Sequence, residues 1–240
     1  MKYVIINGSP RKKNTWAVVK QIKKSLDGEF EEIQLIKENI PICNGCFKCF
    51  DGEENCPHFD KVNPIVEKLK DADGLIITSP VYAMNVSSLL KNYIDHTAYL
   101  YHRPALFTLK GLVVVTTAGA GHKDVAKYLD ETLRHWGVNK VHKIAFACGN
   151  DGLDTKAIDK VAKRFGQDVE SGKLHSPKIM DVIFYNVWRR FALNEDHIER
   201  DRQYWRETGL INHDFAPEVK LGIFKTLIAK ISLALFKKLF

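Results

Sequence analysis

The sequence predicts an α/β protein in which one parallel sheet of five strands lies between layers of helices. Five short apolar runs alternate with segments whose apolar residues recur at helical spacing. Strands that follow one another through helices form βαβ units, and such units build doubly wound parallel sheets. The length of 240 residues and the 45% hydrophobic content suit one domain of this kind with some additional elements.

The apolar runs predict strands over residues 3–7, 33–36, 74–79, 112–117 and 141–147. Residues 3–6 and 112–115 are apolar at every position, which is typical of strands buried on both faces. We therefore expect these two strands near the centre of the sheet. Helical spacing predicts helices between the strands and one after the last strand, over residues 16–26, 62–69, 88–99, 125–136 and 158–169.

The pattern changes after the fifth strand. We predict that residues 1–170 form the sheet domain, with a cysteine loop at residues 43–56, and that residues 171–240 form a helical C-terminal extension with one helix over residues 179–192.

The extension ends in a lysine-studded apolar tail, residues 220–240. On a helical wheel Lys230 and Lys237 lie opposite a stripe of large apolar residues, namely Leu221, Phe224, Ile228, Ile231, Leu235 and Leu239. Two interpretations of this basic amphipathic helix stay open. It docks on the core or on a second subunit, or it makes reversible contact with an anionic membrane surface.

Composition narrows the class of protein and its partners. The 27% of charged residues is close to the globular average and argues against disorder and against a disulfide scaffold. The formal net charge of +7 favours anionic partners, which include phosphate-bearing cofactors, nucleic acid and acidic membranes. Nucleic acid is not expected, because no predicted sheet face interleaves aromatic and basic residues.

We expect a cytoplasmic protein, and the tail leaves open a peripheral position at the inner membrane surface. Met1 leads directly into the apolar run at residues 3–6, without the pattern of a secretory signal. No stretch of about 18 apolar residues predicts a transmembrane helix. Four of the five cysteines crowd into one segment, which is typical of a ligand or redox cluster in a reducing compartment.

The loop after the first predicted strand, residues 8–15, has the composition of a phosphate site. It begins with glycine, carries hydroxyl and basic side chains, and leads into a helix whose N-terminus attracts anions. The alternative is a helix cap at Asn14 or Thr15 beside solvated basic residues. The loop matches neither the P-loop nor the Gly-x-Gly-x2-Gly dinucleotide turn.

Two further loops follow the third and fourth predicted strands. Residues 79–88 combine a proline, Tyr82, Met84 and small polar residues, which suits a shelf for a ring with polar edges. The alternative is an ordinary loop whose Tyr82 and Met84 belong to the core. Residues 116–122 contain Gly119 and Gly121, where the backbone can approach a ligand closely. Ligands of doubly wound sheets bind at these strand ends.

Three motifs together carry a resemblance to a known family. They are Gly-Ser-Pro-Arg at residues 8–11 with Asn14 and Thr15, Ser-Pro-Val-Tyr at 79–82 with Leu-Lys-Asn-Tyr-Ile-Asp at 90–95, and Thr-Thr-Ala-Gly at 116–119. They resemble the flavin-binding segments of the NADPH-dependent FMN reductase and iron–sulfur flavoprotein group over roughly residues 1–150. The resemblance implies a flavodoxin-like fold with strand order 2-1-3-4-5, bound FMN, NAD(P)H as electron donor, and a homo-oligomer.

The resemblance also implies roles for individual residues. The FMN phosphate would be held by Ser9, Arg11, Asn14 and Thr15. The isoalloxazine ring would be flanked by Pro80, Val81, Tyr82, Ala83, Met84, Asn85 and Val86. The pyrimidine edge of the ring would be reached by Thr117, Ala118, Gly119 and Gly121. No catalytic side chain is expected, because the flavin performs the redox step.

The cysteine loop has the pattern C-x2-C-x2-C-x6-C-P, with Cys43, Cys46, Cys49 and Cys56 followed by Pro57. Two overlapping C-x2-C units and the final proline resemble the ligand run of [4Fe–4S] proteins. Structural zinc more often uses two separate C-x2-C units. Three alternatives stay open: a [4Fe–4S] cluster, a zinc ion, or free thiols. Elsewhere, Cys148 is predicted to be a small buried residue, and His96, His102 and His135 to be surface or interface histidines.

The sequence therefore predicts an FMN-dependent NAD(P)H oxidoreductase that passes electrons to a small-molecule or protein acceptor. The acceptor, the preference for NADH or NADPH, and the group bound by the cysteines are left open. The alternative is a non-enzymatic flavoprotein electron carrier or redox sensor. About 70 residues beyond the sheet domain favour an enzyme or an oligomer over a short carrier.

Overall fold

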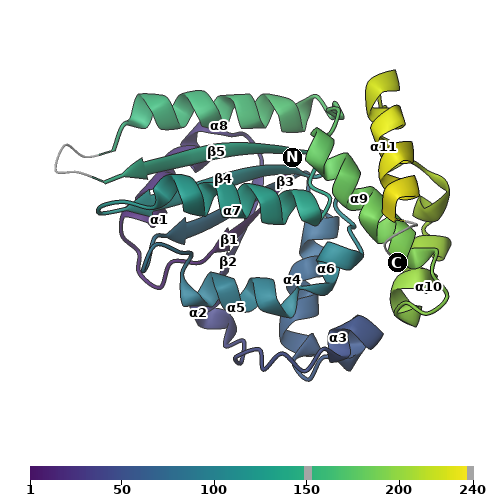
Figure 1. Cartoon of the computed structure of the whole chain (residues 1–240). Helices are drawn as coiled ribbons and strands as arrows, with labels where there is room; N and C mark the ends of the chain where they lie inside the picture. The colour runs from purple at the N-terminus through teal and green to yellow at the C-terminus, as the bar shows by residue number, and fades with distance from the viewer. Residues whose placement is uncertain (149–152, 237–240) are drawn as a thin grey trace.

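A five-stranded parallel sheet forms the centre of the molecule (Figure 1). The computed structural model describes residues 1–148 and 153–236. The strands are β1 (Lys2–Asn7), β2 (Glu29–Gln34), β3 (Gly74–Pro80), β4 (Lys110–Thr117) and β5 (Lys140–Ala147). Their order, β2-β1-β3-β4-β5, confirms the predicted flavodoxin-like topology. All four pairings are parallel.

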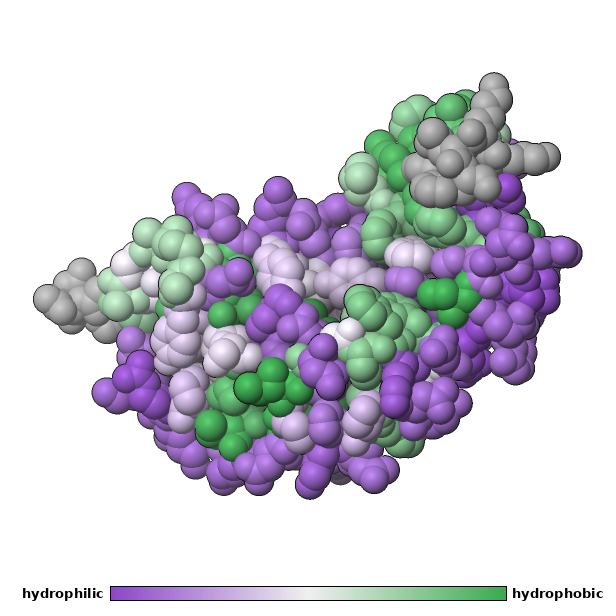
Figure 2. Space-filling model, turned by 60° about the horizontal axis from the view of Figure 1, so that its bottom comes forward, coloured by the Kyte–Doolittle hydropathy of each residue, from purple (hydrophilic) through white to green (hydrophobic). Residues whose placement is uncertain are grey.

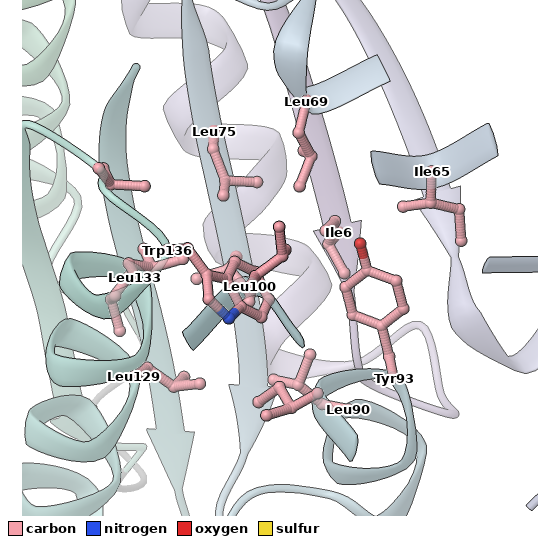
Figure 3. Packing of buried hydrophobic residues seen from close by; sticks show 14 of the residues in the cluster. Ile6, Ile65, Leu69, Leu75, Leu90, Tyr93, Leu100, Leu129, Leu133 and Trp136 are labelled. Carbon is pink, nitrogen blue, oxygen red and sulfur yellow. The ribbon is translucent and has the colours of Figure 1, made fainter. Parts of the chain in front are cut away.

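Both faces of the sheet are covered, and this explains the continuous apolar runs of the central strands. The face that carries Tyr3 and Ile5 packs against α1 (Asn14–Ser25) and α8 (Thr155–Glu170). The face that carries Val4 and Ile6 packs against three helices, α4 (Phe59–Lys70), α5 (Ser88–His96) and α7 (His122–His135). Figure 3 shows this second core, where residues of α4, α5 and α7 converge on β1 and β3.

The second strand differs from its prediction. β2 occupies Glu29–Gln34, and residues 35–38, which include the end of the predicted strand, form the short helix α2 (Leu35–Glu38). β2 lies at the edge of the sheet, where most of its side chains keep contact with solvent. Glu31 and Glu32 can therefore remain charged, and they pair with Lys68 and Lys23 at 2.7 and 2.9 Å. A search for apolar runs misses such a strand.

The C-terminal helices pack beside the sheet, at the right of Figure 1. They are α9 (Ile179–Ala192), α10 (Glu199–Glu207), η2 (Leu210–Asn212) and α11 (Ile223–Phe236). Their buried residues, among them Tyr185 and Trp205, form a third hydrophobic cluster separate from the two faces of the sheet. Three short helices lie nearby, α3 (Lys48–Asp51), η1 (Glu53–Asn55) and α6 (Tyr99–His102).

The predicted tail helix is present as α11, and it packs against α9. Its small residues Ala229 and Ser232 are buried, whereas Phe224, Ile231 and Leu235 of the predicted stripe are 66%, 48% and 59% exposed. Leu221 and Ile228 are half-buried, and Lys237 and Leu239 lie outside the described residues. No helix in the described ranges is long and apolar enough to span a membrane.

Candidate functional site

The loops after β1, β3 and β4 meet at a cavity of about 440 Å³ at the carboxyl edge of the sheet. The cavity lies where the strand order reverses between β1 and β3, the position at which sheets of this topology bind ligands. The residues that line it are Ser9, Arg11, Lys13, Asn14, Thr15, Pro80, Val81, Tyr82, Thr116 and Thr117. The fold thus brings together eight of the residues predicted for FMN. Lys13 and Thr116 were not predicted, although Lys13 directly precedes the first helix.

The N-terminus of α1 opens toward this cavity with the properties of an anion site. No side chain caps the helix, and its first turn contains no acidic residue, so its N–H groups keep their partial positive charge. Arg11 donates a hydrogen bond from Nη2 to Tyr82 Oη at 3.3 Å and so links the first loop to the second. Lys12, by contrast, lies over the ring of Trp16 at 5.2 Å. This arrangement fits a phosphate group.

Hydroxyl groups and a close backbone contact hold the first loop in place. The buried Thr15 and Thr116 hydroxyls lie 2.7 Å apart, and Ser9 Oγ donates to Arg11 O at 2.8 Å. A Cβ on Gly8 would lie 2.8 Å from Thr78 O and 2.9 Å from Leu90 Cβ. Glycine is therefore needed at position 8 because the loop packs tightly against β3 and α5.

The second loop forms a tight turn that displays Met84. Tyr82 and Asn85 exchange two backbone hydrogen bonds of 2.9 Å, and the two residues between them are left-handed, with φ of 45° at Ala83 and 63° at Met84. Met84 is 59% exposed and Tyr82 is 37% exposed, so neither belongs to the core. Val86 is only 5% exposed and packs in the hydrophobic core.

The third loop supports the second. Thr117 Oγ1 accepts from Gly119 N and donates to Ala120 O, both at 3.1 Å. Gly121 has a φ of 87°, and a Cβ there would lie 3.1 Å from Met84 Sδ. Seven of the predicted flavin residues do not line the cavity itself: Ala83, Met84, Asn85, Val86, Ala118, Gly119 and Gly121. Their contact with the flavin stays a prediction.

Cys148 lies half-buried after β5, close to the first loop. Burial raises the pKa of its thiol, and a hydrogen bond with the Asn14 side chain acts in the opposite direction. Asn14 therefore has a partner within the protein, in addition to its place in the lining of the cavity.

A second cavity of about 460 Å³ lies beside the cysteine loop. All four predicted ligands line it, Cys43, Cys46, Cys49 and Cys56, together with Phe47, His58 and His96. Burial raises the pKa of Cys49 to about 11; Cys56 and Cys43 add to the shift, whereas Arg103 opposes it. The fold thus gathers four sulfur donors from one segment around one space.

The sulfur atoms are spread more widely than a single zinc ion requires. A tetrahedral zinc site places its sulfurs about 3.8 Å apart, given Zn–S bonds of about 2.3 Å. Within the described ranges, the one group of three possible ligand atoms that all lie within 4.8 Å of one another is His102, His197 and Asp201. No three of the four sulfurs therefore lie as close together as a tetrahedral zinc site would bring them.

Helix α5 fixes the start of the cysteine segment. Asn92 Oδ1 accepts from Cys43 N at 2.8 Å, and Asn92 Nδ2 donates to Pro41 O at 3.0 Å. His96 Nε2 lies 2.9 Å from Pro41 O, and its Nδ1 lies 3.7 Å from Cys56 Sγ. His96 is 3% exposed, so its prediction as a surface or interface histidine was wrong. The spacing of four residues between Asn92 and His96 was the available signal, because it places both on one helix face.

The same helix connects the two cavities. α5 begins directly after the second loop of the carboxyl-edge cavity, and its last residue, His96, lines the cysteine cavity. A helix of nine residues is roughly 13 Å long.

Comparison with known proteins identifies the family. The chain matches the NADPH-dependent FMN reductase family over residues 1–152. It belongs to this family. Membership makes the chain an FMN-dependent NAD(P)H oxidoreductase, as the three loop motifs predict.

Individual relatives extend the comparison beyond residue 152. An iron–sulfur flavoprotein from Archaeoglobus fulgidus is 30% identical over an alignment of 222 residues that covers 88% of this chain and 100% of the relative. An NADPH azoreductase from a Bacillus species is 28% identical over 76% of this chain and 89% of its own length. Among solved structures, the flavoenzyme NAD(P)H:acceptor oxidoreductase from Paracoccus denitrificans has a TM-score of 0.52 at 19% identity, over 72% of this chain and 99% of the other, which supports the fold.

Proposed function

We propose that this oxidoreductase binds FMN at the carboxyl-edge cavity, holds a [4Fe–4S] cluster with Cys43, Cys46, Cys49 and Cys56, and uses both groups in the oxidation of NAD(P)H. The observation that carries the cluster is that all four cysteines line one cavity. Thiolate ligands select iron–sulfur clusters or zinc, and no three of the four sulfurs lie as close together as a tetrahedral zinc site requires. The iron–sulfur flavoprotein that aligns over its whole length supports the same choice.

The residues of the first cavity have separate tasks in this proposal. When bound, FMN supplies the chemistry of hydride acceptance and onward electron transfer. Arg11, Lys13 and the N-terminus of α1 hold its phosphate by charge and by N–H donation. Pro80 and Tyr82, which line the cavity, would flank the ring, and the exposed side chain of Met84 would lie beside it.

Metal analysis of anaerobically purified protein tests the cluster. Serine at any one of the four ligands is expected to lower iron and inorganic sulfide together while FMN stays bound. Cys148→Ser is the matched control, because Cys148 lies outside the lining of the cysteine cavity, and it should keep full iron. Stoichiometric zinc, or no metal after reconstitution, would refute the cluster and leave the FMN assignment intact.

Membership in a reductase family favours the enzyme over the non-enzymatic carrier or redox sensor. Steady NAD(P)H oxidation by the holoprotein, measured with a quinone, a nitroaromatic and free flavin, should identify the class of acceptor. If none of these acceptors supports turnover while a protein partner does, the carrier is the better description.

We also propose that the extension, residues 171–240, attaches the enzyme to an anionic membrane through α11. Figure 2 shows apolar side chains gathered at the end of the molecule that α9 and α11 form. Exposed large residues of α11 are Ile223, Phe224, Leu227, Ile231 and Leu235. Residues 219–240 carry five lysines and neither Asp nor Glu. Two copies of this surface would repel each other, whereas an anionic bilayer accepts both its lysines and its apolar side chains.

Sedimentation with lipid vesicles tests the attachment. The enzyme is expected to bind phosphatidylglycerol vesicles at low salt and to bind phosphatidylcholine vesicles weakly. Phe224→Ser with Ile231→Ser should reduce binding by at least tenfold, since a buried apolar side chain contributes about 1.5–3 kcal/mol. Ile36→Ser removes a comparable exposed side chain from α2 and should change nothing. Binding that survives the double substitution contradicts the proposal.

We propose a homo-oligomer, as the family resemblance implies, whose interface does not include α11, since that helix is assigned to the membrane in the proposal above. Deletion of residues 219–240 should then leave the oligomer unchanged in analytical ultracentrifugation. Dissociation to a monomer on this deletion would instead assign α11 to a subunit interface.

A further inference from the structure

Arg103 is a buried cation whose side chain forms hydrogen bonds with the backbone of the cysteine loop. Its side chain is 1% exposed. Nη2 donates to Cys49 O at 2.6 Å, and Nη1 donates to Phe50 O at 3.2 Å. Its Nε lies 3.3 Å from Glu53 Oε1, an ion pair without hydrogen-bond geometry. One guanidinium therefore contacts the loop at three points, which requires a planar fork with several donors.

The charge of Arg103 is balanced from the C-terminal extension. Asp201 of α10 is 2% exposed, and its Oδ1 accepts from Arg103 Nη1. Its Oδ2 lies 2.7 Å from His102 Nδ1 and 3.1 Å from His197 Nε2. A buried guanidinium without such a partner would be strongly unfavourable. Asp201 and Glu53 together offset the charge of Arg103 where it reaches the loop, and Asp201 is the more deeply buried of the two.

Helix α10 makes further contacts around this pair. Trp205 Nε1 donates to His102 O at 2.9 Å, and Tyr204 Oη donates to Pro104 O at 2.7 Å. The backbone on both sides of Arg103 is thus held by α10. Arg200 Nε donates to Glu53 Oε2 at 3.3 Å, which ties α10 directly to η1.

Aromatic packing continues the connection. The His102 ring lies between Phe50 of the cysteine loop, at 4.4 Å, and Trp188 of α9, at 3.7 Å. Phe50 also stacks with Phe47 at 5.9 Å. The loop that carries the four cysteines therefore rests on the C-terminal helices as well as on α5.

From these contacts we infer that Asp201 is a positioning residue: through Arg103 it holds the cysteine loop in the conformation that binds the metal group. The inference rests on the proposed cluster for its consequence and on the described contacts for its geometry. The C-terminal extension thus helps to position the cysteine loop, which lies about 150 residues before Asp201 in the sequence.

Hydrogen exchange of the cluster-free enzyme tests the geometry separately from the cluster. Asp201→Asn should speed amide exchange in residues 43–58 at least tenfold while the β1 and β4 amides remain protected. Asp214→Asn is the matched control. It breaks an ion pair of the same extension, Arg189 Nη1 to Asp214 Oδ1 at 2.9 Å, that does not contact the loop. Equal exchange of the loop in Asp201→Asn and Asp214→Asn would overturn the inference.

Two readouts on the loaded enzyme test the consequence. Asp201→Asn should lower iron and sulfide retention while leaving FMN content unchanged. It should also raise the midpoint potential of the remaining cluster, because Glu53 alone then offsets the positive charge of Arg103 beside Cys49. A general loss of stability does not move that potential, and Asp214→Asn should leave it unchanged. If wild-type protein holds no iron, the proposed cluster fails and the exchange experiment still decides the anchoring role.

A milder variant covers the case in which Asp201→Asn does not fold. Arg200→Gln removes the partly exposed ion pair between α10 and Glu53. It should loosen the loop in the same direction and to a smaller extent. Loop exchange identical to that of the wild type in Arg200→Gln would then contradict the inference.

Discussion

At the scale of single residues, Lys12 and Lys13 show how the fold separates neighbours of identical chemistry. Lys13 lines the carboxyl-edge cavity beside Arg11, whereas Lys12 lies over the Trp16 ring. Both belong to the same basic run in the sequence. The direction in which α1 begins therefore places Lys13, and not Lys12, where it could bind a phosphate in the cavity.

This difference predicts a selective effect on cofactor binding. Arg11→Gln with Lys13→Gln should weaken FMN binding roughly 100-fold, since each hydrogen bond to a charged group contributes about 1.5–3 kcal/mol. Riboflavin, which has no phosphate, should bind as before. Lys12→Gln removes the same charge outside the cavity and should leave FMN binding within about twofold. Titration of flavin fluorescence measures all three, and an equal loss for FMN and riboflavin would remove the phosphate from this site.

At the scale of elements, the turn between Tyr82 and Asn85 stores backbone strain at the cavity. Two residues other than glycine adopt left-handed conformations in succession, Ala83 and Met84. Each left-handed L-residue costs about 1–2 kcal/mol. The two backbone hydrogen bonds between Tyr82 and Asn85 and the contact of Met84 with Gly121 stabilise the turn against this cost.

Relief of this strain should be measurable. Ala83→Gly is expected to raise the free energy of unfolding by about 0.5–1 kcal/mol, because glycine adopts this φ without strain and offsets only part of the gain through its entropy. Ala118→Gly, in the neighbouring loop where φ is not positive, should lower it instead. Urea unfolding of the two variants checks the prediction, which is wrong if both variants lose stability equally.

At the scale of the whole molecule, buried and half-buried carboxylates join the C-terminal part of the chain to the sheet. Asp130 of α7 accepts from Lys178 at 2.9 Å, and Asp168 of α8 pairs with His142 and His175 at 2.7 and 3.0 Å. Asp201 completes the set through Arg103. Three of these contacts reach residues beyond the sheet domain: Asp130 to Lys178, Asp168 to His175 and Arg103 to Asp201.

The protonation of Asp201, Asp130 and His142 affects how the free energy of unfolding changes at acid pH. Burial alone would raise the pKa of Asp201, but hydrogen bonds with His102 and His197 and the charge of Arg103 outweigh it and hold the pKa below the usual value. Burial alone would also raise the pKa of Asp130, but the charge of Arg134 and the hydrogen bond from Lys178 keep that pKa below its usual value. Burial lowers the pKa of His142, and the hydrogen bond with Asp168 opposes this shift only in part.

The lowered pKa values of Asp201, Asp130 and His142 all make the folded state less stable as the pH falls. An acid with a lowered pKa stabilises the fold above its unfolded value, about 3.9, and loses that contribution as the pH falls toward its folded value. A histidine with a lowered pKa loses its contribution below about 6.5, because the unfolded chain then binds more protons. The free energy of unfolding should therefore fall as the pH is lowered from about 6.5 to about 3. For each extra proton that the unfolded chain binds, the fall is roughly 1.4 kcal/mol per pH unit.

Urea unfolding at pH 7, 5 and 3.5, followed by tryptophan fluorescence, measures this loss. Asp130→Asn should lower stability at pH 7 and flatten the dependence below pH 4. A wild-type stability that does not change over this range would contradict the assignment of these carboxylates.

By itself, the sequence determined the α/β class with one parallel sheet, the three loops at its carboxyl edge and the grouping of the cysteines, whereas the strand order was implied by the family resemblance. These features depend on neighbours in the chain. Apolar runs report burial on both faces, and a loop that follows a parallel strand must emerge at one edge of the sheet. The resemblance to the reductase family implied the eight predicted residues that line the carboxyl-edge cavity, and this rule explains why they meet there.

Only the tertiary structure decided the position of β2, the burial of His96, the outward stripe of α11, and the pairing of Arg103 with Asp201. Each depends on contacts between residues far apart in the chain. The Arg103–Asp201 contact spans 98 positions, and the bond from Cys43 N to Asn92 spans 49. No local pattern reports such a contact, because the free energy that favours it exists only after two distant segments have packed together.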